Sequence, residues 1–273
     1  MRVTVKYRVA RRVTQLGMLL LGLGGMMKAE AGSIKEQTIE YQGEGKTYSG
    51  FLAMPTHGKA LPGVLVIHNW MGVTDETKSK VRNLAALGYA AFAADIYGKD
   101  NRPKNVEEAG KLAMQFKTDR KMYREHLNLG LKQLASVQGV DSKKLAAIGY
   151  CFGGTGVIEL ARSGATVLGV ASFHGGLDSP EPALGKNIKA KVIAFHGADD
   201  PWVPAKDVTA FEEEMRANKL DWQLIKYGNA VHSFTDQGAG NDPSKGAAYN
   251  ANADRRSWAE MKNFLTEIFQ SAH

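Results

Sequence analysis

Short apolar runs alternate with longer amphipathic segments from Pro62 to the end of the chain. This alternation is typical of parallel strands that are joined by helices and buried on both faces. We therefore expect an α/β protein with a mostly parallel sheet flanked by helices. The expected strands are residues 64–67, 90–94, 145–148, 167–173, 192–195 and 222–227, and the expected helices are residues 75–87, 105–117, 120–137, 154–163, 205–217 and 246–269.

Two further strands are expected before this region. Residues 36–41 and 47–53 carry β-favouring side chains, and Gly43 with Gly45 supplies a turn between them. This N-terminal antiparallel hairpin brings the expected sheet to eight strands. Since no repeat, low-complexity tract or linker divides the sequence, we predict a single domain over residues 32–273.

The first 31 residues have the pattern of a signal peptide. Basic residues between Arg2 and Arg12 precede an apolar run from Leu16 to Met27, and Ala29-Glu30-Ala31 follows. The run contains four glycines and is shorter than the roughly 20 residues that a membrane-spanning helix needs. We predict cleavage after Ala31 and a periplasmic or secreted protein without stable membrane insertion. The pair Arg11-Arg12 leaves the export route open.

The positive charge of the chain is concentrated in this leader. Residues 1–31 hold six of the 35 Lys and Arg residues and one of the 28 Asp and Glu residues, so the remainder has 29 basic and 27 acidic residues, a net charge of +2. The remaining sequence has no clustered basic segment, which excludes the nucleic-acid-binding class on charge grounds. We expect a monomer that acts on a small molecule.

Cys151 is the only cysteine, and the residues around it form a pattern that is typical of a reactive nucleophile. The stretch from Leu145 to Gly154 predicts a buried strand, a sharp turn and then a helix. Gly149 and Gly153 flank Cys151 at two residues on either side, as in the nucleophile elbow of α/β-hydrolases. The helix that begins here directs free amides toward the thiol, which favours a thiolate. We predict an α/β-hydrolase fold with a cysteine nucleophile.

An acid and a histidine follow in the order that this fold requires. Asp200 comes after the expected strand 192–195, and His232 comes after the expected strand 222–227. Asp199 is the rival acid, but Asp200 is favoured because it begins Asp-Pro-Trp-Val-Pro, which leads away into a helix. Three other histidines end apolar runs, and for them we expect lining or supporting roles: His68, His174 and His196. We expect His57 and His273 at the surface, and His126 as a hydrogen-bonded polar residue in the middle of a helix.

The chain resembles the dienelactone hydrolases, a carboxymethylenebutenolidase-like family of the α/β-hydrolase superfamily. The residues that carry the resemblance are Gly149-Tyr-Cys-Phe-Gly-Gly154, Asp200-Pro-Trp-Val-Pro204, His232-Ser-Phe234, the run Tyr89 to Tyr97, Ala248-Tyr-Asn250 and Arg256-Ser-Trp258. The resemblance covers nearly all of the sequence after the leader. It implies an ester or lactone hydrolase with a Cys151-Asp200-His232 triad, a covalent acyl-enzyme, and an oxyanion hole formed by the backbone amides of Phe152 and Trp70.

Two positions depart from the family pattern. Well-known members carry a glutamate in the first oxyanion loop, where this chain has Asn69. We therefore expect either that His232 deprotonates Cys151 directly or that the two rest as a thiolate and an imidazolium. Those members also bind the substrate carboxylate with an arginine shortly after the histidine, where this chain has Asp236. A neutral ester or lactone is therefore as plausible a substrate as an anionic one. As candidates for lining the substrate pocket we name Asn69, Tyr97, Lys99, His174 and Ser233.

Two other function classes remain alternatives. The departures at Asn69 and Asp236 would also fit a catalytically weakened, ligand-binding envelope protein on the same fold. A redox thiol would fit an exposed cysteine, but the sequence offers no resolving cysteine. The sequence has no metal-ligand spacing or nucleotide-binding glycine loop, so we expect neither a metal nor a cofactor.

Overall fold

Eight strands form one sheet in a computed structural model that describes residues 33–271. The predicted signal peptide, residues 1–31, lies outside these described residues. The sheet order is β1-β2-β4-β3-β5-β6-β7-β8. The strands are β1 (Ile34–Gly43), β2 (Lys46–Pro55), β3 (Leu61–Ile67), β4 (Ala90–Ala94), β5 (Val140–Tyr150), β6 (Gly169–Phe173), β7 (Lys191–Gly197) and β8 (Trp222–Tyr227). The pairs β1-β2 and β2-β4 are antiparallel and the others are parallel, which confirms the predicted fold class.

The hairpin turn differs in detail from the prediction. Gly43 pairs with Lys46 as the last rung of the β1-β2 ladder, so the turn consists of Glu44 and Gly45. Both turn residues have positive φ, 48° and 70°. Positive φ at both central positions matches the twist of the flanking strands in a two-residue hairpin.

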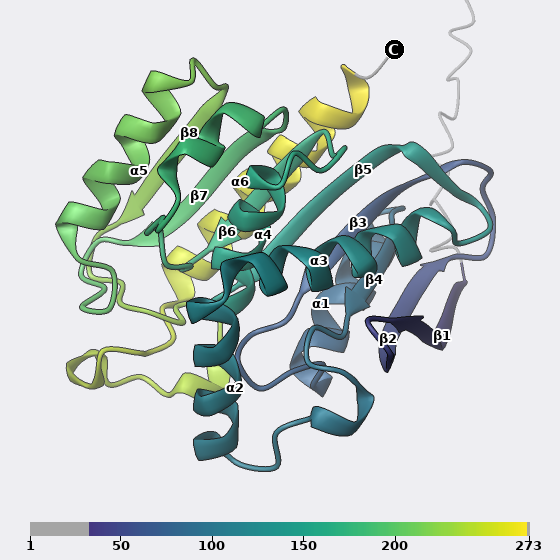
Figure 1. The fold of residues 1–273 in the computed structure, drawn as a ribbon, viewed down its shortest axis with the longest axis horizontal. Coiled ribbons are helices and arrows are strands. Elements are labelled where there is room, and N and C mark those ends of the chain that lie inside the picture. The colour runs from purple at the N-terminus through teal and green to yellow at the C-terminus, as the bar shows by residue number, and fades with distance from the viewer. Residues whose placement is uncertain (1–32, 272–273) are drawn as a thin grey trace, which may run out of the picture. The chain divides into compact units, whose positions relative to one another are not determined.

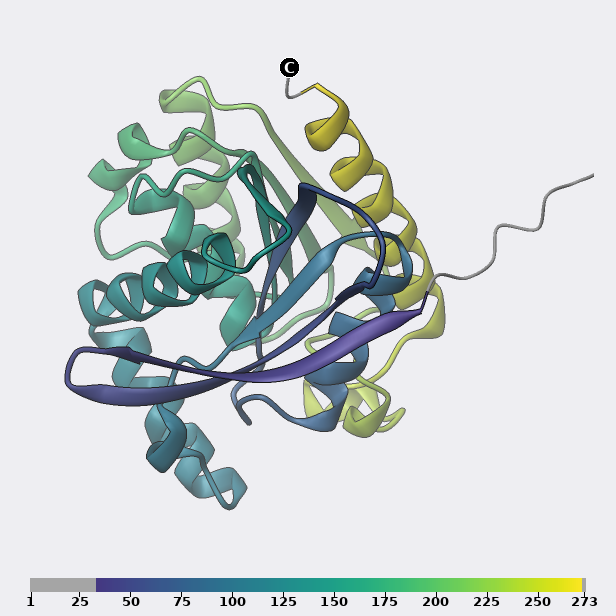
Figure 2. The same cartoon turned by 90° about the vertical axis from the view of Figure 1, so that its right-hand side faces the viewer.

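Helices cover both faces of the sheet (Figure 1). The helices are α1 (Asp75–Ala86), α2 (Val106–Thr118), α3 (Arg120–Ala135), α4 (Phe152–Arg162), α5 (Ala205–Ala217) and α6 (Ala251–Gln270). One buried cluster contains side chains of α2, α3, α4 and α5, and the other contains side chains of α1 and α6. Figure 2 looks at the sheet from its β1 side, with α1 and α6 on one side and α2 and α3 on the other.

The starts of α4 and α6 depart from the predicted ones by two or more residues, for local reasons. Helix α4 begins at Phe152, directly after the cysteine, whereas the sequence suggested residue 154. Helix α6 begins only at Ala251, because Gly246 adopts a left-handed conformation and the Asn250 side chain accepts a hydrogen bond from the Ala253 amide. Within residues 33–271, no helix is long and apolar enough to cross a membrane.

Candidate functional site

The turn after β5 holds Cys151 in a strained backbone conformation, with φ 54° and ψ −113°. Such positive φ at a non-glycine residue is uncommon and persists only where the surroundings enforce it. The flanking glycines allow this packing. A Cβ on Gly149 would overlap the Gly153 carbonyl, and a Cβ on Gly153 would overlap the Ile67 carbonyl at the end of β3. The sequence thus uses glycine where strand and helix approach most closely.

The loops after β7 and β8 bring an acid and a base to the cysteine. His232 Nε2 lies 3.0 Å from Cys151 Sγ. Its other nitrogen, Nδ1, donates a hydrogen bond of 2.8 Å to Asp200 Oδ2. Asp200 Oδ1 accepts a hydrogen bond from the Trp202 amide at 2.9 Å, which fixes the carboxylate. Asp200 is buried, whereas its rival Asp199 is exposed.

The charges of this group shift two pKa values in opposite directions. Burial alone would raise the pKa of the Cys151 thiol, but the charge and hydrogen bond of His232, the charge of Lys117 and the Phe152 amide together lower it. Burial alone would lower the pKa of His232, but Cys151 and Asp200 raise it to about 9. Both shifts favour a thiolate and imidazolium pair.

The loop after β3 is held by two of the residues expected to line the pocket. Asn69 Oδ1 accepts a hydrogen bond from the Met71 amide at 2.9 Å, and its Nδ2 donates to Glu76 Oε2 at 3.0 Å. The buried Tyr97 hydroxyl donates to the Trp70 carbonyl at 2.9 Å. Asn69 and Tyr97 therefore support the loop that presents Trp70 and are not among the side chains that line the cavity. The Phe152 amide belongs to the first turn of α4, where helical amides lack an intrahelical partner.

A cavity of about 500 Å³ opens in front of Cys151 and His232. Apolar side chains make up much of its wall, among them Trp70, Met114, Trp202 and Val203. It also contains Ser233, one of the expected lining residues, and the charged residues Lys117 and Asp236. A cavity of this size with mostly apolar walls and a few polar groups suits a small organic molecule.

Two other candidate residues lie elsewhere. Lys99 pairs with Glu40 of β1 at 2.7 Å on the surface and does not line the cavity. His174 is buried beneath the site, where it contacts the Cys151 backbone and is not a lining residue.

The sequence reasoning did not identify Lys117, Met114 or Trp202 as residues of the cavity. Helix α2 carried a signal for two of them: Gly110, Ala113, Met114 and Lys117 recur at helical spacing and face the cavity together.

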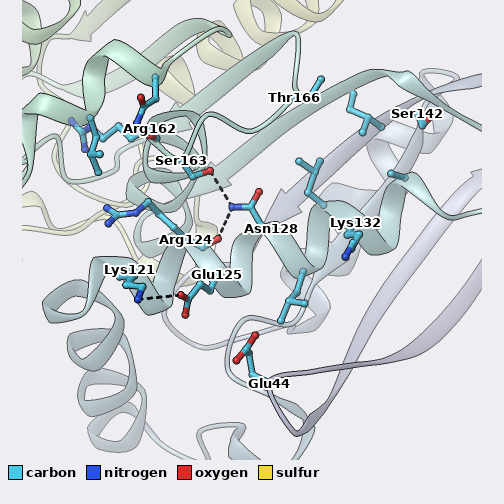
Figure 3. A pocket seen from close by; sticks show the side chains of 16 residues that line it. Glu44, Lys121, Arg124, Glu125, Asn128, Lys132, Ser142, Arg162, Ser163 and Thr166 are labelled. Carbon is cyan, nitrogen blue, oxygen red and sulfur yellow. Dashed lines mark hydrogen bonds and ion pairs between the residues drawn. The ribbon is translucent and has the colours of Figure 1, made fainter.

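A second hollow, of about 740 Å³, lies along α3 (Figure 3). Some of its polar side chains are hydrogen-bonded or ion-paired within the hollow. Lys121 lies 4.0 Å from Glu125, and Asn128 donates to Ser163 at 3.0 Å and to the Arg124 carbonyl at 2.7 Å. It is more open to solvent and has no nucleophile next to a base. In the described part of the chain, no group of three or more His, Cys, Asp or Glu side chains could hold a metal ion.

Comparisons with known proteins find a matching family model and several similar chains. A model described as "Dienelactone hydrolase family" matches residues 48–269. A solved structure named m3DLH is 37% identical, with a TM-score of 0.83, and the match covers 87% of this chain and 100% of that one. A dienelactone hydrolase-like promiscuous phosphotriesterase, P91 from metagenomic libraries, is 36% identical with a TM-score of 0.83, over 87% of this chain and 99% of that one. A putative carboxymethylenebutenolidase of Synechocystis sp. is 27% identical over 86% of this chain and 98% of its own.

Proposed function

Since the chain belongs to the dienelactone hydrolase family, we propose that it hydrolyses a carboxylic ester or lactone with Cys151 as the nucleophile. One observation carries this proposal: His232 spans Cys151 and Asp200, at 3.0 Å from Sγ and 2.8 Å from Oδ2. A nucleophile next to a base that a third group orients is the arrangement that covalent catalysis needs. The low pKa of the thiol and the raised pKa of His232 support attack by a thiolate.

The reaction proceeds in two halves. Cys151 Sγ attacks the carbonyl carbon, and the amides of Phe152 and Trp70 donate hydrogen bonds to the oxyanion. The tetrahedral intermediate collapses to a thioester as His232 Nε2 gives its proton to the leaving alkoxide, which remains tethered when the substrate is a lactone. Water then attacks the thioester while His232 accepts a proton from it. The carboxylic acid leaves and the thiolate and imidazolium pair is restored.

The charges in the cavity bear on the substrate class. Lys117 and Asp236 both line it, whereas the walls beside them are apolar. The opposite charges largely offset each other at long range, so the site has no strong overall preference for an anion. We therefore propose a small ester or lactone with an apolar acyl part, neutral or with a single anionic group near Lys117.

A panel of esters and lactones tests the proposal. We expect turnover by the parent chain and an acyl adduct on Cys151 in mass spectra of the quenched reaction. Cys151→Ala and His232→Ala should each lose roughly 10³-fold or more in kcat/KM while remaining folded. His57→Ala, at an exposed position outside the cavity, serves as the control. Tight ligand binding with no turnover dependent on Cys151 would instead favour a ligand-binding protein on this fold.

A phosphotriester is a second candidate substrate. One structure with 36% identity and a TM-score of 0.83 bears the name promiscuous phosphotriesterase. The same thiolate and amide donors could attack phosphorus and bind the phosphoryl oxygen. If the parent chain hydrolyses a nitrophenyl phosphotriester and Cys151→Ala does not, this activity is supported. Equal rates for the parent chain and Cys151→Ala would rule it out.

We also propose that the chain is exported and loses its first 31 residues. The support is the basic, apolar and small-residue pattern of the leader. Expression in a bacterial host followed by cell fractionation and intact-mass measurement tests this. A chain that stays in the cytoplasm with its leader attached would contradict it.

A further inference from the structure

His174 lies directly behind the nucleophile and has no role in the reaction as described so far. It follows β6, has a relative exposure of 2% and adopts a positive φ of 40°. Its neighbour Gly175 packs so closely against α4 that a Cβ there would overlap the backbone of Gly154. The packing of backbone against backbone therefore fixes the position from which the His174 side chain extends.

The two ring nitrogens of His174 contact two different loops. Nδ1 accepts a hydrogen bond of 3.1 Å from the Cys151 amide, which shares its hydrogen with the Phe173 carbonyl at 3.0 Å. Nε2 lies 2.9 Å from Oγ1 of Thr235, a buried residue three positions after His232. Because Nδ1 is an acceptor, the proton of the neutral ring is on Nε2 and is donated to Thr235. One imidazole thus joins the residue that carries the nucleophile to the loop that carries the base.

We propose that His174 is a positioning residue that sets the alignment of Cys151 with His232 by bridging the Cys151 amide and the Thr235 hydroxyl. This inference rests on the proposed function, since it concerns how the same two groups are brought into register. The elbow and the base belong to separate loops, after β5 and β8. Errors of about 1 Å in such an alignment can cost roughly 100-fold in rate.

The bridge needs an uncharged ring. Burial lowers the pKa of His174 well below its ordinary value, and the nearby charges of His232 and Lys80 lower it further. The His174 and His232 rings lie 5.3 Å apart, so a proton on His174 would repel the imidazolium. It would also break the hydrogen bond between the ring and the Cys151 amide, because a protonated Nδ1 cannot accept a hydrogen bond, and the amide would keep only the Phe173 carbonyl.

Lys80 provides a second tie on the same loop. Its Nζ donates to the Thr235 carbonyl at 3.1 Å, and the Asn250 amide donates to the Phe234 carbonyl at 3.1 Å, so the loop stays anchored when the bridge is cut. Substitutions that remove only the bridge should therefore shift the site without unfolding the loop. A loss of activity in a variant whose loop stays folded therefore indicates a positioning role for His174 and not only a packing role.

Three variants probe the bridge. His174→Phe removes both hydrogen bonds, and Thr235→Val removes one with little change of volume. His174→Gln keeps an acceptor and a donor, both bonded to the same carbon. His126→Phe is the matched control, because His126 is equally buried but contacts the Ile96 carbonyl and Tyr48 instead. The readouts are kcat/KM, the thermal midpoint, and the rate at which iodoacetamide alkylates Cys151 as a function of pH. The last readout reports the thiol pKa without requiring turnover.

We expect His174→Phe to lower kcat/KM about 100-fold and to slow alkylation near pH 6 about 10-fold through a higher thiol pKa. Thr235→Val should lower kcat/KM about 10-fold, and His174→Gln should stay within about 10-fold of the parent. The control should change only the thermal midpoint.

Unchanged alkylation profiles in His174→Phe and Thr235→Val, whatever their thermal midpoints, would overturn the positioning role. If His174→Phe does not fold, Thr235→Val decides alone. Should Cys151→Ala retain full activity, the proposed function itself fails, and the alkylation profiles still report on the bridge.

Discussion

At the scale of single residues, the pKa of His232 determines how activity should depend on pH. The active pair is a thiolate and an imidazolium, so activity needs a pH above the lowered pKa of Cys151 and below the raised pKa of His232, about 9. Alkyl esters release a basic alkoxide that must take the proton of His232. We therefore expect a bell-shaped profile of kcat/KM for an alkyl ester, with its alkaline limb near pH 9.

The leaving group provides the control for this pH prediction. Nitrophenoxide is a weak base and needs no proton to leave, so the alkaline limb should weaken or vanish for a nitrophenyl ester. Stopped assays between pH 5 and 10, corrected for spontaneous hydrolysis, would show the difference. Alkaline limbs of equal depth for both esters would contradict proton donation by His232.

Lys117 is expected to act on both the nucleophile and the substrate. It lines the cavity, and its charge is one cause of the low pKa of Cys151. Lys117→Gln should raise the thiol pKa and slow alkylation at pH 6 by about 2-fold to 5-fold, a small effect because the side chain is solvent-exposed. It should also reduce kcat/KM about 10-fold more for an ester with a carboxylate than for its neutral analogue.

Lys111 offers a matched control on the same helix. It is exposed, pairs with Glu107 at 2.7 Å and does not line the cavity. Lys111→Gln should leave the thiol pKa and the preference between the two esters unchanged. If Lys117→Gln and Lys111→Gln had the same thiol pKa and the same preference between the two esters, Lys117 would have no role in the site.

At the scale of elements, the junction of β5 and α4 depends on close backbone contact. A Cβ on Gly153 would overlap the Ile67 carbonyl, and backbone at the end of a central strand has little room to move. Gly153→Ala should therefore lower the free energy of unfolding by about 3 kcal/mol, despite the better helix propensity of alanine. Urea unfolding measures this. Gly228→Ala, where no atom lies within 4 Å of the added Cβ, should change the free energy by less than about 0.5 kcal/mol.

The same junction illustrates what sequence patterns can predict. Strands and helices were predictable because buried strands are almost wholly apolar and the helices carry one apolar stripe, as β4 and α3 do. The elbow was predictable because its glycines are a local steric requirement. Each of the three residues Cys151, Asp200 and His232 follows a parallel strand. Because parallel strands end at the same edge of the sheet, the order of strands and residues along the sequence also predicts that these side chains lie close together.

Sequence patterns could not predict contacts between distant surfaces. Lys99 was expected in the pocket from its place after Tyr97, but the twist of the long hairpin brings Glu40 beside it. Helical spacing places Met114 and Lys117 on one face of α2, but it does not determine that this face meets the cavity. The bridge by His174 depends on two loops whose hydrogen bonds have no short sequence signature.

At the scale of the whole molecule, buried histidines should make stability depend on pH. Burial lowers the pKa of His68, His126, His174 and His196. In the unfolded chain these rings take up protons near pH 6.5, whereas in the folded chain they remain neutral to lower pH. The unfolded state then binds more protons, so stability falls as the pH decreases below about 6.5.

The pair formed by Cys151 and His232 should not change how the free energy of unfolding depends on pH near neutrality. Between about pH 6.5 and 9, the folded pair holds one proton on His232, and the unfolded pair holds one proton on Cys151. The number of bound protons is then the same in both states, so the pair adds no slope. We expect a plateau of stability from about pH 7 to 8.5.

Urea unfolding at half-unit steps from pH 5.5 to 8.5 tests both parts of this expectation, because most carboxylates stay ionised in this range. His68 and His174, whose pKa values burial lowers most strongly, should each contribute up to about 1.4 kcal/mol of lost stability per pH unit below 6.5, and His126 and His196, which lie nearer the surface, less. His126→Gln, which cannot take up a proton, should make the acid slope shallower. Stability that stays constant down to pH 5.5 would mean that the buried rings are protonated in the folded protein, which would also remove the acceptor that His174 offers to Cys151.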